Sequence, residues 1–237
     1  MIEILQAGTT AFNLTLSEAQ LDTFASYQRE LAIWNEKFNL TRIIEPSEVA
    51  IKHFLDSLSI ATVLSALKTP RLIIDVGSGA GFPGIPLKIA QPQLSMTLLE
   101  STGKKTTFLR HVVETLGLTN IAVVTARAEE AGRQAAHREH YDVAVARAVS
   151  RLAVLAEYTL PLVKVGGWVI AQKGQHPAEE IETGERAVRI LGGKIVEVRP
   201  VEVPGLEAER HLVIIKKNKP TSKQYPRQPG GPAKDPL

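Results

Sequence analysis

The sequence predicts an α/β fold: a mostly parallel, seven-stranded sheet with helices on both faces and an antiparallel hairpin at its end. Three observations support this prediction. Short apolar runs alternate with helical stretches from residue 71 onward, as in successive βαβ units. The runs are almost continuously apolar, which is typical of strands buried on both sides. The last two runs are too close together for a helix to fit between them.

Residues 1–70 are expected to form a helical segment ahead of the sheet. The sequence SEAQ at residues 17–20 has the spacing of a capping box. Positions spaced three or four apart between Leu21 and Phe38 are mostly apolar, which indicates one face of an amphipathic helix. A second helical stretch is expected from about Ser47 to about Leu67.

The sheet itself is expected to span residues 71–217. Its parallel strands are predicted at 71–76, 96–100, 120–126, 141–148 and 168–174. Two more strands, 194–203 and 210–217, are joined only by PGLEAE and should pair as a hairpin. Pro200 cannot donate a ladder hydrogen bond, so we expect it at a sheet edge or a bulge.

Composition limits the chemistry. The chain has 237 residues and no cysteine, which excludes disulfides, thiolate metal sites and cysteine nucleophiles. No apolar run approaches the roughly 18 residues that a membrane span requires, and the N-terminus lacks the features of a signal peptide. We therefore expect a cytoplasmic protein without a membrane anchor.

The charge is concentrated at one end. From Lys216 onward the chain carries a net charge of +5, whereas the preceding residues carry −2. Residues 218–237 are also rich in proline and glycine and are predicted to form a flexible basic tail. Such a tail either binds polyanions or only keeps the protein in solution.

The most informative stretch is IIDVGSGAGFPGIPL, residues 73–87. It matches two fingerprints of nucleotide-binding turns. One is an acid followed by alternating glycines (Asp75, Gly77, Gly79, Gly81). The other is the dinucleotide pattern, whose glycines begin two residues further along the chain. Both place the turn at the carboxyl end of the first strand, where ligands of such sheets bind. Both also use an acid at the end of the second strand, Glu100, to hold ribose hydroxyls.

Three features favour S-adenosylmethionine over a dinucleotide as the ligand of this turn. The alternating-glycine register begins directly at the strand end, and the dinucleotide register begins two residues late. Pro83 and Pro86 remove amide donors that a pyrophosphate would use. A terminal antiparallel hairpin is usual in methyltransferases.

Other candidate residues follow the remaining strands. Ala128 and Glu129 follow the third strand, where they would flank an adenine or simply begin a helix. Arg147, near the end of the fourth strand, suits a carboxylate or phosphate. Together with the C-terminal tail, further basic residues form either a phosphate-contacting rim or a plain solvated surface: Lys104, Lys105, Arg110, His111 and Lys173.

Two pairs of residues with helical spacing contain histidine. His53 and Asp56 share one helix face, and a structural pair is favoured there over a catalytic one. His137 and His140 have no third ligand nearby, so we predict no metal site.

Seven motifs together resemble, in order, the bacterial RsmG (GidB) family. They are WNEKFNLTRI, KHFLDSL, IIDVGSGAGFPGIPLKI, LLESTGKKTTFLRHVVETLGL, ARAEE, VARAVSRLAVLAEYTLPLV and GGWVIAQKGQ. The resemblance covers about residues 20–217. It implies a Rossmann-like methyltransferase fold that uses S-adenosylmethionine to methylate N7 of a guanine in 16S (small-subunit) ribosomal RNA. Ribosomal RNA or the small ribosomal subunit would be the partner.

The resemblance also implies the site residues. Those on the cofactor side are Gly77, Gly79, Phe82, Glu100, Ser101, Thr102, Ala128, Glu129 and Arg147. Candidates on the substrate side are Asn39, Thr41, His53, Asp56, Ser57, Arg147 and Lys173. No general base is assigned, because guanine N7 carries a lone pair and no proton. Another RNA, a protein or a small molecule as substrate, or a non-catalytic binding module, remain the alternatives.

Overall fold

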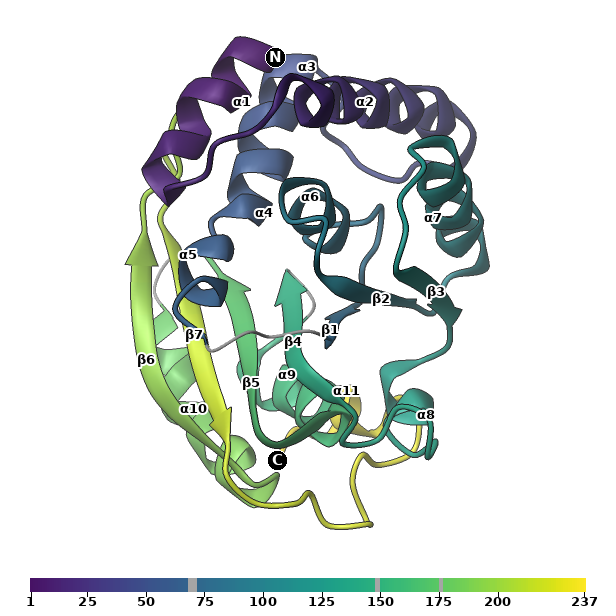
Figure 1. Ribbon diagram of the computed structural model, residues 1–237. Coiled ribbons are helices and arrows are strands. Elements are labelled where there is room, and N and C mark those ends of the chain that lie inside the picture. Colours follow the sequence, from purple (N-terminus) through teal and green to yellow (C-terminus); the bar gives the residue numbers. More distant parts are fainter. Residues whose placement is uncertain (68–71, 148–149, 175–176) are drawn as a thin grey trace.

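The computed structural model has a seven-stranded sheet with helices on both faces (Figure 1). It describes residues 1–67, 72–147, 150–174 and 177–237. The strand order is β3-β2-β1-β4-β5-β7-β6. All neighbours up to β5 are parallel, and β7 is antiparallel to both β5 and β6. The strands are β1 Leu72–Val76, β2 Ser95–Glu100, β3 Ile121–Thr125, β4 Tyr141–Arg147, β5 Val163–Lys173, β6 Gly193–Val201 and β7 Arg210–Lys217.

The central strands are buried on both faces. In β4, Val143 and Val145 belong to one apolar cluster, whereas Ala144 and Ala146 belong to another. This alternation follows from the two-residue period of a strand. It explains why the central runs are apolar throughout, as the sequence predicted.

One face of the sheet carries the N-terminal helices together with α6 and α7. These elements are α1 Ile2–Thr9, η1 Thr10–Phe12, α2 Glu18–Phe38, α3 Pro46–Val49, η2 Ala50–Leu55, α4 Asp56–Leu58, α5 Ala61–Leu64, α6 Gly84–Ala90 and α7 Gly103–Thr115. The Tyr27 hydroxyl in α2 donates to the Ala80 carbonyl at 2.5 Å, which ties α2 to the turn after β1. The helical segment therefore shares one core with the sheet.

The other face carries α8, α9 and α10. These elements and the remaining short ones are α8 Ala128–Ala131, α9 Leu152–Thr159, η3 Leu160–Leu162, α10 Pro177–Ile190 and α11 Gly231–Lys234. Within the described ranges, none of the helices combines the length and the apolar character that a membrane span requires.

Most predicted elements are confirmed. Ser17 and Gln20 form the capping box at the start of α2, and Pro200 lies on the edge strand β6. The second helical stretch differs from the prediction, because it is divided into short pieces around the π-helical η2. The predicted boundary between residues 70 and 71 lies outside the described residues, as does the predicted end of the fourth strand at residue 148.

The C-terminal segment, residues 218–237, differs most from expectation. It was predicted to be a flexible tail, but it packs along the sheet assembly from the end of β7 to α8 (Figure 1). Thr221, Pro226 and Pro232 are buried. The physical reason is that its polar groups find buried partners: Arg227 pairs with Glu157, a carboxylate whose side chain is only 1% exposed.

Candidate functional site

The turn after β1, residues 77–84, combines close packing with open space. Gly77, Gly79 and Gly81 all have positive φ angles, which glycine adopts without a steric penalty. A Cβ at Gly81 would lie 2.5 Å from Ile85 and 2.6 Å from the Tyr27 hydroxyl, so packing demands that glycine. A Cβ at Gly79 would meet only the Gly77 carbonyl, at 3.9 Å. Gly79 therefore borders open space.

Glu100, at the end of β2, holds this turn in place. Its carboxylate accepts hydrogen bonds from the Gly79 amide at 2.9 Å and the Thr102 amide at 2.8 Å. The side chain is buried, whereas Ser101 and Thr102 are exposed. The acid thus fixes the loops after β1 and β2 relative to each other.

Asp75, in β1, has one carboxyl oxygen without a partner. Its Oδ2 accepts from the Gly84 amide at 2.9 Å, whereas the buried Oδ1 has no hydrogen bond. Burial raises the pKa of Asp75 to about 7. An unpaired polar atom beneath a glycine turn is a group that a polar ligand can satisfy.

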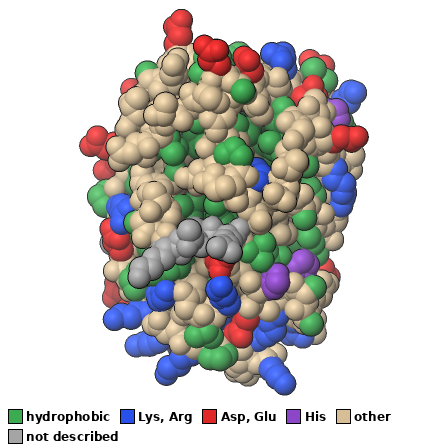
Figure 2. Space-filling model, viewed as in Figure 1, with side chains coloured by type: hydrophobic (Ala, Val, Ile, Leu, Met, Phe, Trp, Pro, Cys, Tyr) green, Lys and Arg blue, Asp and Glu red, His purple; other side chains and the backbone are tan. Residues whose placement is uncertain are grey.

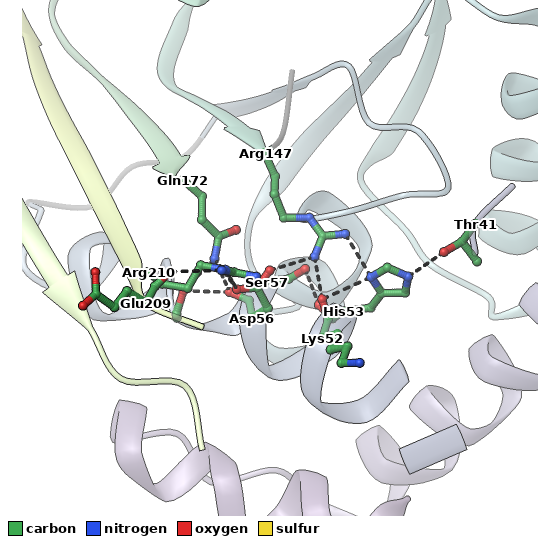
Figure 3. A network of polar contacts seen from close by, with 10 residues as sticks. Thr41, Lys52, His53, Asp56, Ser57, Arg147, Gln172, Glu209 and Arg210 are labelled. Carbon is green, nitrogen blue, oxygen red and sulfur yellow. Dashed lines mark hydrogen bonds and ion pairs between the residues drawn. The ribbon is translucent and has the colours of Figure 1, made fainter. Parts of the chain in front are cut away.

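A second group of polar side chains gathers on Asp56 in α4 (Figure 3). Arg147, the last residue of β4, reaches Asp56 Oδ2 at 3.1 Å. Arg210, the first residue of β7, and Gln172, near the end of β5, reach Oδ1 at 2.8 and 2.9 Å. Because β7 runs antiparallel to β5, its first residue lies at the same sheet edge as the ends of β4 and β5.

His53 lies beside this group and is neutral. Its Nε2 is 2.8 Å from Thr41 Oγ1, and its Nδ1 is 3.3 Å from a guanidinium nitrogen of Arg147. Nδ1 also lies 3.2 Å from the Lys52 carbonyl, so it has both a donor and an acceptor within reach. Burial and the positive charge of Arg147 lower the pKa of His53 to about 4.

Phe82 connects the glycine turn to the Asp56 group. Its ring stacks on the His53 ring with centroids 4.4 Å apart, and the Arg147 guanidinium lies 4.9 Å from its centroid. Both distances are within the range of stacking and cation–π contact. The turn and the polar group are therefore two sides of one site.

A cavity of about 390 Å³ opens next to Asp56 and contains four cationic side chains. Its lining residues are Lys52, His53, Asp56, Arg147, Gln172, Lys173, Gly174 and Arg210. We call it the basic cavity. A larger cavity of about 580 Å³ lies along the β6–β7 connection, and none of the site residues predicted from the sequence lines it.

Four of the substrate-side candidates line the basic cavity: His53, Asp56, Arg147 and Lys173. Thr41 contacts it only through His53. Asn39 is exposed in the left-handed C-cap of α2. Ser57 is buried and donates to the His53 carbonyl at 2.6 Å, so it holds the helix backbone and does not line the basic cavity.

The basic residues predicted to form a rim lie in two places, because Lys173 lines the basic cavity and the others belong to α7. Lys104, Lys105 and Arg110 belong to α7 and do not line the basic cavity, and His111 pairs with Glu30 at 2.6 Å. Sequence reasoning missed Lys52, Gln172 and Arg210. A signal existed for Arg210, because the predicted hairpin places the first residue of its second strand at this sheet edge.

On the cofactor side, Ala128 is half-buried and Glu129 is buried at the start of α8. The Glu129 carboxylate accepts a hydrogen bond from the Gly230 amide at 2.9 Å. In the part of the chain that the structure describes, no cluster of three or more His, Asp or Glu side chains suits a metal ion.

Comparison with known proteins places the chain in a family. The family model described as rRNA small subunit methyltransferase G matches residues 20–213. The chain belongs to this family. It is 50% identical to "Ribosomal RNA small subunit methyltransferase G" of Roseiflexus castenholzii, over all of both chains. It is 47% identical to the protein of that name from Acetivibrio thermocellus, over 99% of this chain and 96% of the relative.

Solved structures of more distant proteins share the fold. TrmN from Thermus thermophilus matches with a TM-score of 0.53 at 19% identity, over 71% of this chain and 53% of that chain. Precorrin-6y C5,15-methyltransferase from Geobacter metallireducens matches with a TM-score of 0.51 at 14% identity, over 75% and 92% of the two chains. The Rossmann-like methyltransferase fold expected for the family is confirmed.

The lowered pKa of His53 predicts a pH-dependent loss of stability. The unfolded chain, with a pKa near 6.5, binds this proton more tightly than the folded chain, with a pKa of about 4. The stabilisation by neutral His53 is therefore complete above pH 6.5 and is lost as the pH falls from 6.5 to about 4. We expect the free energy of unfolding, measured by urea titration, to fall over this window in the wild type. The fall should be roughly 2–3 kcal/mol larger than in His53→Gln. Parallel curves for the two proteins would contradict a buried neutral His53.

Proposed function

We propose that this protein transfers the methyl group of S-adenosylmethionine to N7 of a guanine in 16S ribosomal RNA. As a member of its family, the chain is an S-adenosylmethionine-dependent ribosomal RNA methyltransferase. The choice of guanine N7 rests on the resemblance of its motifs. The observation that carries the proposal is the Phe82 bridge, because it joins a ligand-ready glycine turn to a basic cavity.

The cofactor side of the proposed site is the glycine turn with its neighbouring loops. The open space at Gly79 and the unpaired Asp75 Oδ1 are both compatible with a polar ligand lying against the backbone. Gly77, Gly79 and Phe82 would line the methionine end. The loop of Glu100, Ser101 and Thr102 would face the ribose, and Ala128 and Glu129 would flank the adenine.

The substrate side of the proposed site is the basic cavity. Lys52, Arg147, Lys173 and Arg210 outnumber the single acid Asp56 among the lining residues. Lys52 and Lys173 also pair with Glu48 and Glu180, which do not line the cavity. The two arginines around Asp56 keep a positive charge there, which favours the phosphates that accompany any RNA base. Arg147 belongs to both sides, since it contacts Phe82 as well as Asp56.

The chemistry requires little from the chain beyond placement. S-adenosylmethionine supplies an electrophilic methyl group, and guanine N7 supplies a lone pair. Because N7 carries no proton, no side chain has to act as a general base. His53 fits this requirement, because burial and the positive charge of Arg147 lower its pKa to about 4 and make it a weak base. Catalysis then depends on alignment and on exclusion of water, which supply roughly 7–11 kcal/mol in favourable cases.

The partner we propose is the small ribosomal subunit or its RNA, and the location is cytoplasmic, where that RNA is found. The direct experiment uses labelled S-adenosylmethionine with small subunits, and separately with naked 16S RNA, from cells that lack this protein. We expect the label at N7 of a guanine in at least one of the two substrates. Label at another atom, or only in protein, would overturn the proposal.

A substitution at Gly79 tests the cofactor side. Asp tolerates the left-handed backbone of this position, so Gly79→Asp should fold while its carboxylate fills the open space. We expect affinity for S-adenosylmethionine, measured by calorimetry, to fall by at least about a hundredfold, or about 2.8 kcal/mol.

The matched control is Gly117→Asp. Gly117 has a similar φ of +61°, against +59° at Gly79, and nothing lies within 4 Å of its added Cβ. This variant should bind the cofactor as the wild type does. Wild-type affinity in Gly79→Asp would place the cofactor elsewhere.

A further inference from the structure

The C-terminal segment connects two distant parts of the fold. It leaves β7 at the far end of the sheet, where the Thr221 hydroxyl donates to the Leu191 carbonyl at 2.7 Å. It then crosses to α8, which follows β3, the strand at the opposite edge of the sheet (Figure 1). Arg138 binds it on the way, donating to the carbonyls of Thr221 and Tyr225 at 2.7 and 2.8 Å.

Its strongest attachment is the pair of Arg227 with Glu157. Glu157 lies in α9, and its carboxylate accepts hydrogen bonds from the Arg227 amide at 2.7 Å and from the guanidinium at 2.7–3.1 Å. The carboxylate is 1% exposed, whereas the guanidinium is 27% exposed. A buried charge without its partner is strongly unfavourable, so Glu157 holds Arg227 in this position.

Beyond Arg227, the segment contacts α8 directly. The Gly230 amide donates to the Glu129 carboxylate at 2.9 Å. A Cβ at Gly132, directly after α8, would lie 2.9 Å from the ring of Pro226, so this proline packs closely against the end of α8. A four-residue helix has little stability of its own, and its position depends on what packs against it.

From these contacts we propose that the C-terminal segment acts as a brace that positions α8. Arg227 is the positioning residue. The position of α8 then sets the affinity for the adenine end of the cofactor. The inference rests on the proposed function, in which Ala128 and Glu129 flank the adenine. It gives the C-terminal segment a role in cofactor binding. The remaining cations of the segment stay at the surface, and Lys and Arg side chains gather at the lower end of the face in Figure 2.

The test is Arg227→Ala in the full-length protein, with Lys223→Ala as the matched control. Both variants remove one cation from the same segment, but Lys223 is exposed. We expect Arg227→Ala to raise the Kd and KM for S-adenosylmethionine at least about tenfold. Its kcat at saturating cofactor and its KM for the RNA substrate should stay near wild type. Lys223→Ala should leave cofactor affinity unchanged, and Arg227→Lys should restore part of what Arg227→Ala loses.

A second readout separates positioning from general loss of structure. Affinities are measured for S-adenosylhomocysteine and for its inosine analogue, in which hypoxanthine replaces adenine. If the segment positions α8, Arg227→Ala should bring the affinity for S-adenosylhomocysteine closer to the affinity for the inosine analogue. If Arg227→Ala does not fold, truncation after Gln228 keeps the Arg227–Glu157 pair and removes the Gly230 donor, and it should show the same two changes.

The outcomes of this test distinguish the two proposals. A wild-type protein that does not bind S-adenosylmethionine would overturn the proposed function. A wild type that binds it, together with a folded Arg227→Ala or truncated protein of equal affinity and an unchanged analogue ratio, would overturn the brace alone. A weaker RNA interaction with unchanged cofactor affinity would likewise overturn the brace and assign the segment to RNA binding.

Discussion

The buried carboxylate of Asp56 is the interaction on which the site depends. It belongs to the N-terminal helical segment, and it is held by Arg147, Arg210 and Gln172 from three strands of the sheet. The pairing fixes where the helices lie over the carboxyl ends of the strands. It also leaves a surplus of positive charge at the mouth of the cavity, because two guanidinium groups share one carboxylate.

This arrangement links the two halves of the proposed reaction. Arg147 is held by Asp56 on one side and lies against Phe82 of the glycine turn on the other. The glycine turn is itself held by Tyr27 of α2 and Glu100 of β2. Alignment of a methyl group with a base nitrogen therefore depends on contacts between elements far apart in the sequence. On the opposite side of the sheet, the C-terminal segment extends the same support to α8.

Sequence reasoning recovered what local patterns encode. The antiparallel pairing of the hairpin, the capping box of α2 and the glycine turn all follow from spacing and residue type. His53 and Asp56 were expected to pair with each other, but their side chains bind other residues: both contact Arg147, and His53 also contacts Thr41. Gln172 and Arg210 meet Asp56 only through long-range strand pairing, which a single sequence does not display. The C-terminal segment was misjudged because its composition indicates solvation, and its buried partner Glu157 is 70 residues away.

The most direct test of this account is Asp56→Asn, which keeps the size of the side chain and removes its charge. The account predicts that kcat/KM for methyl transfer to the RNA substrate falls by at least about tenfold, or about 1.4 kcal/mol. The variant should still fold, as judged by urea unfolding, and its affinity for S-adenosylmethionine should change far less than its rate. A folded Asp56→Asn protein with the wild-type rate would contradict the central role given to this carboxylate.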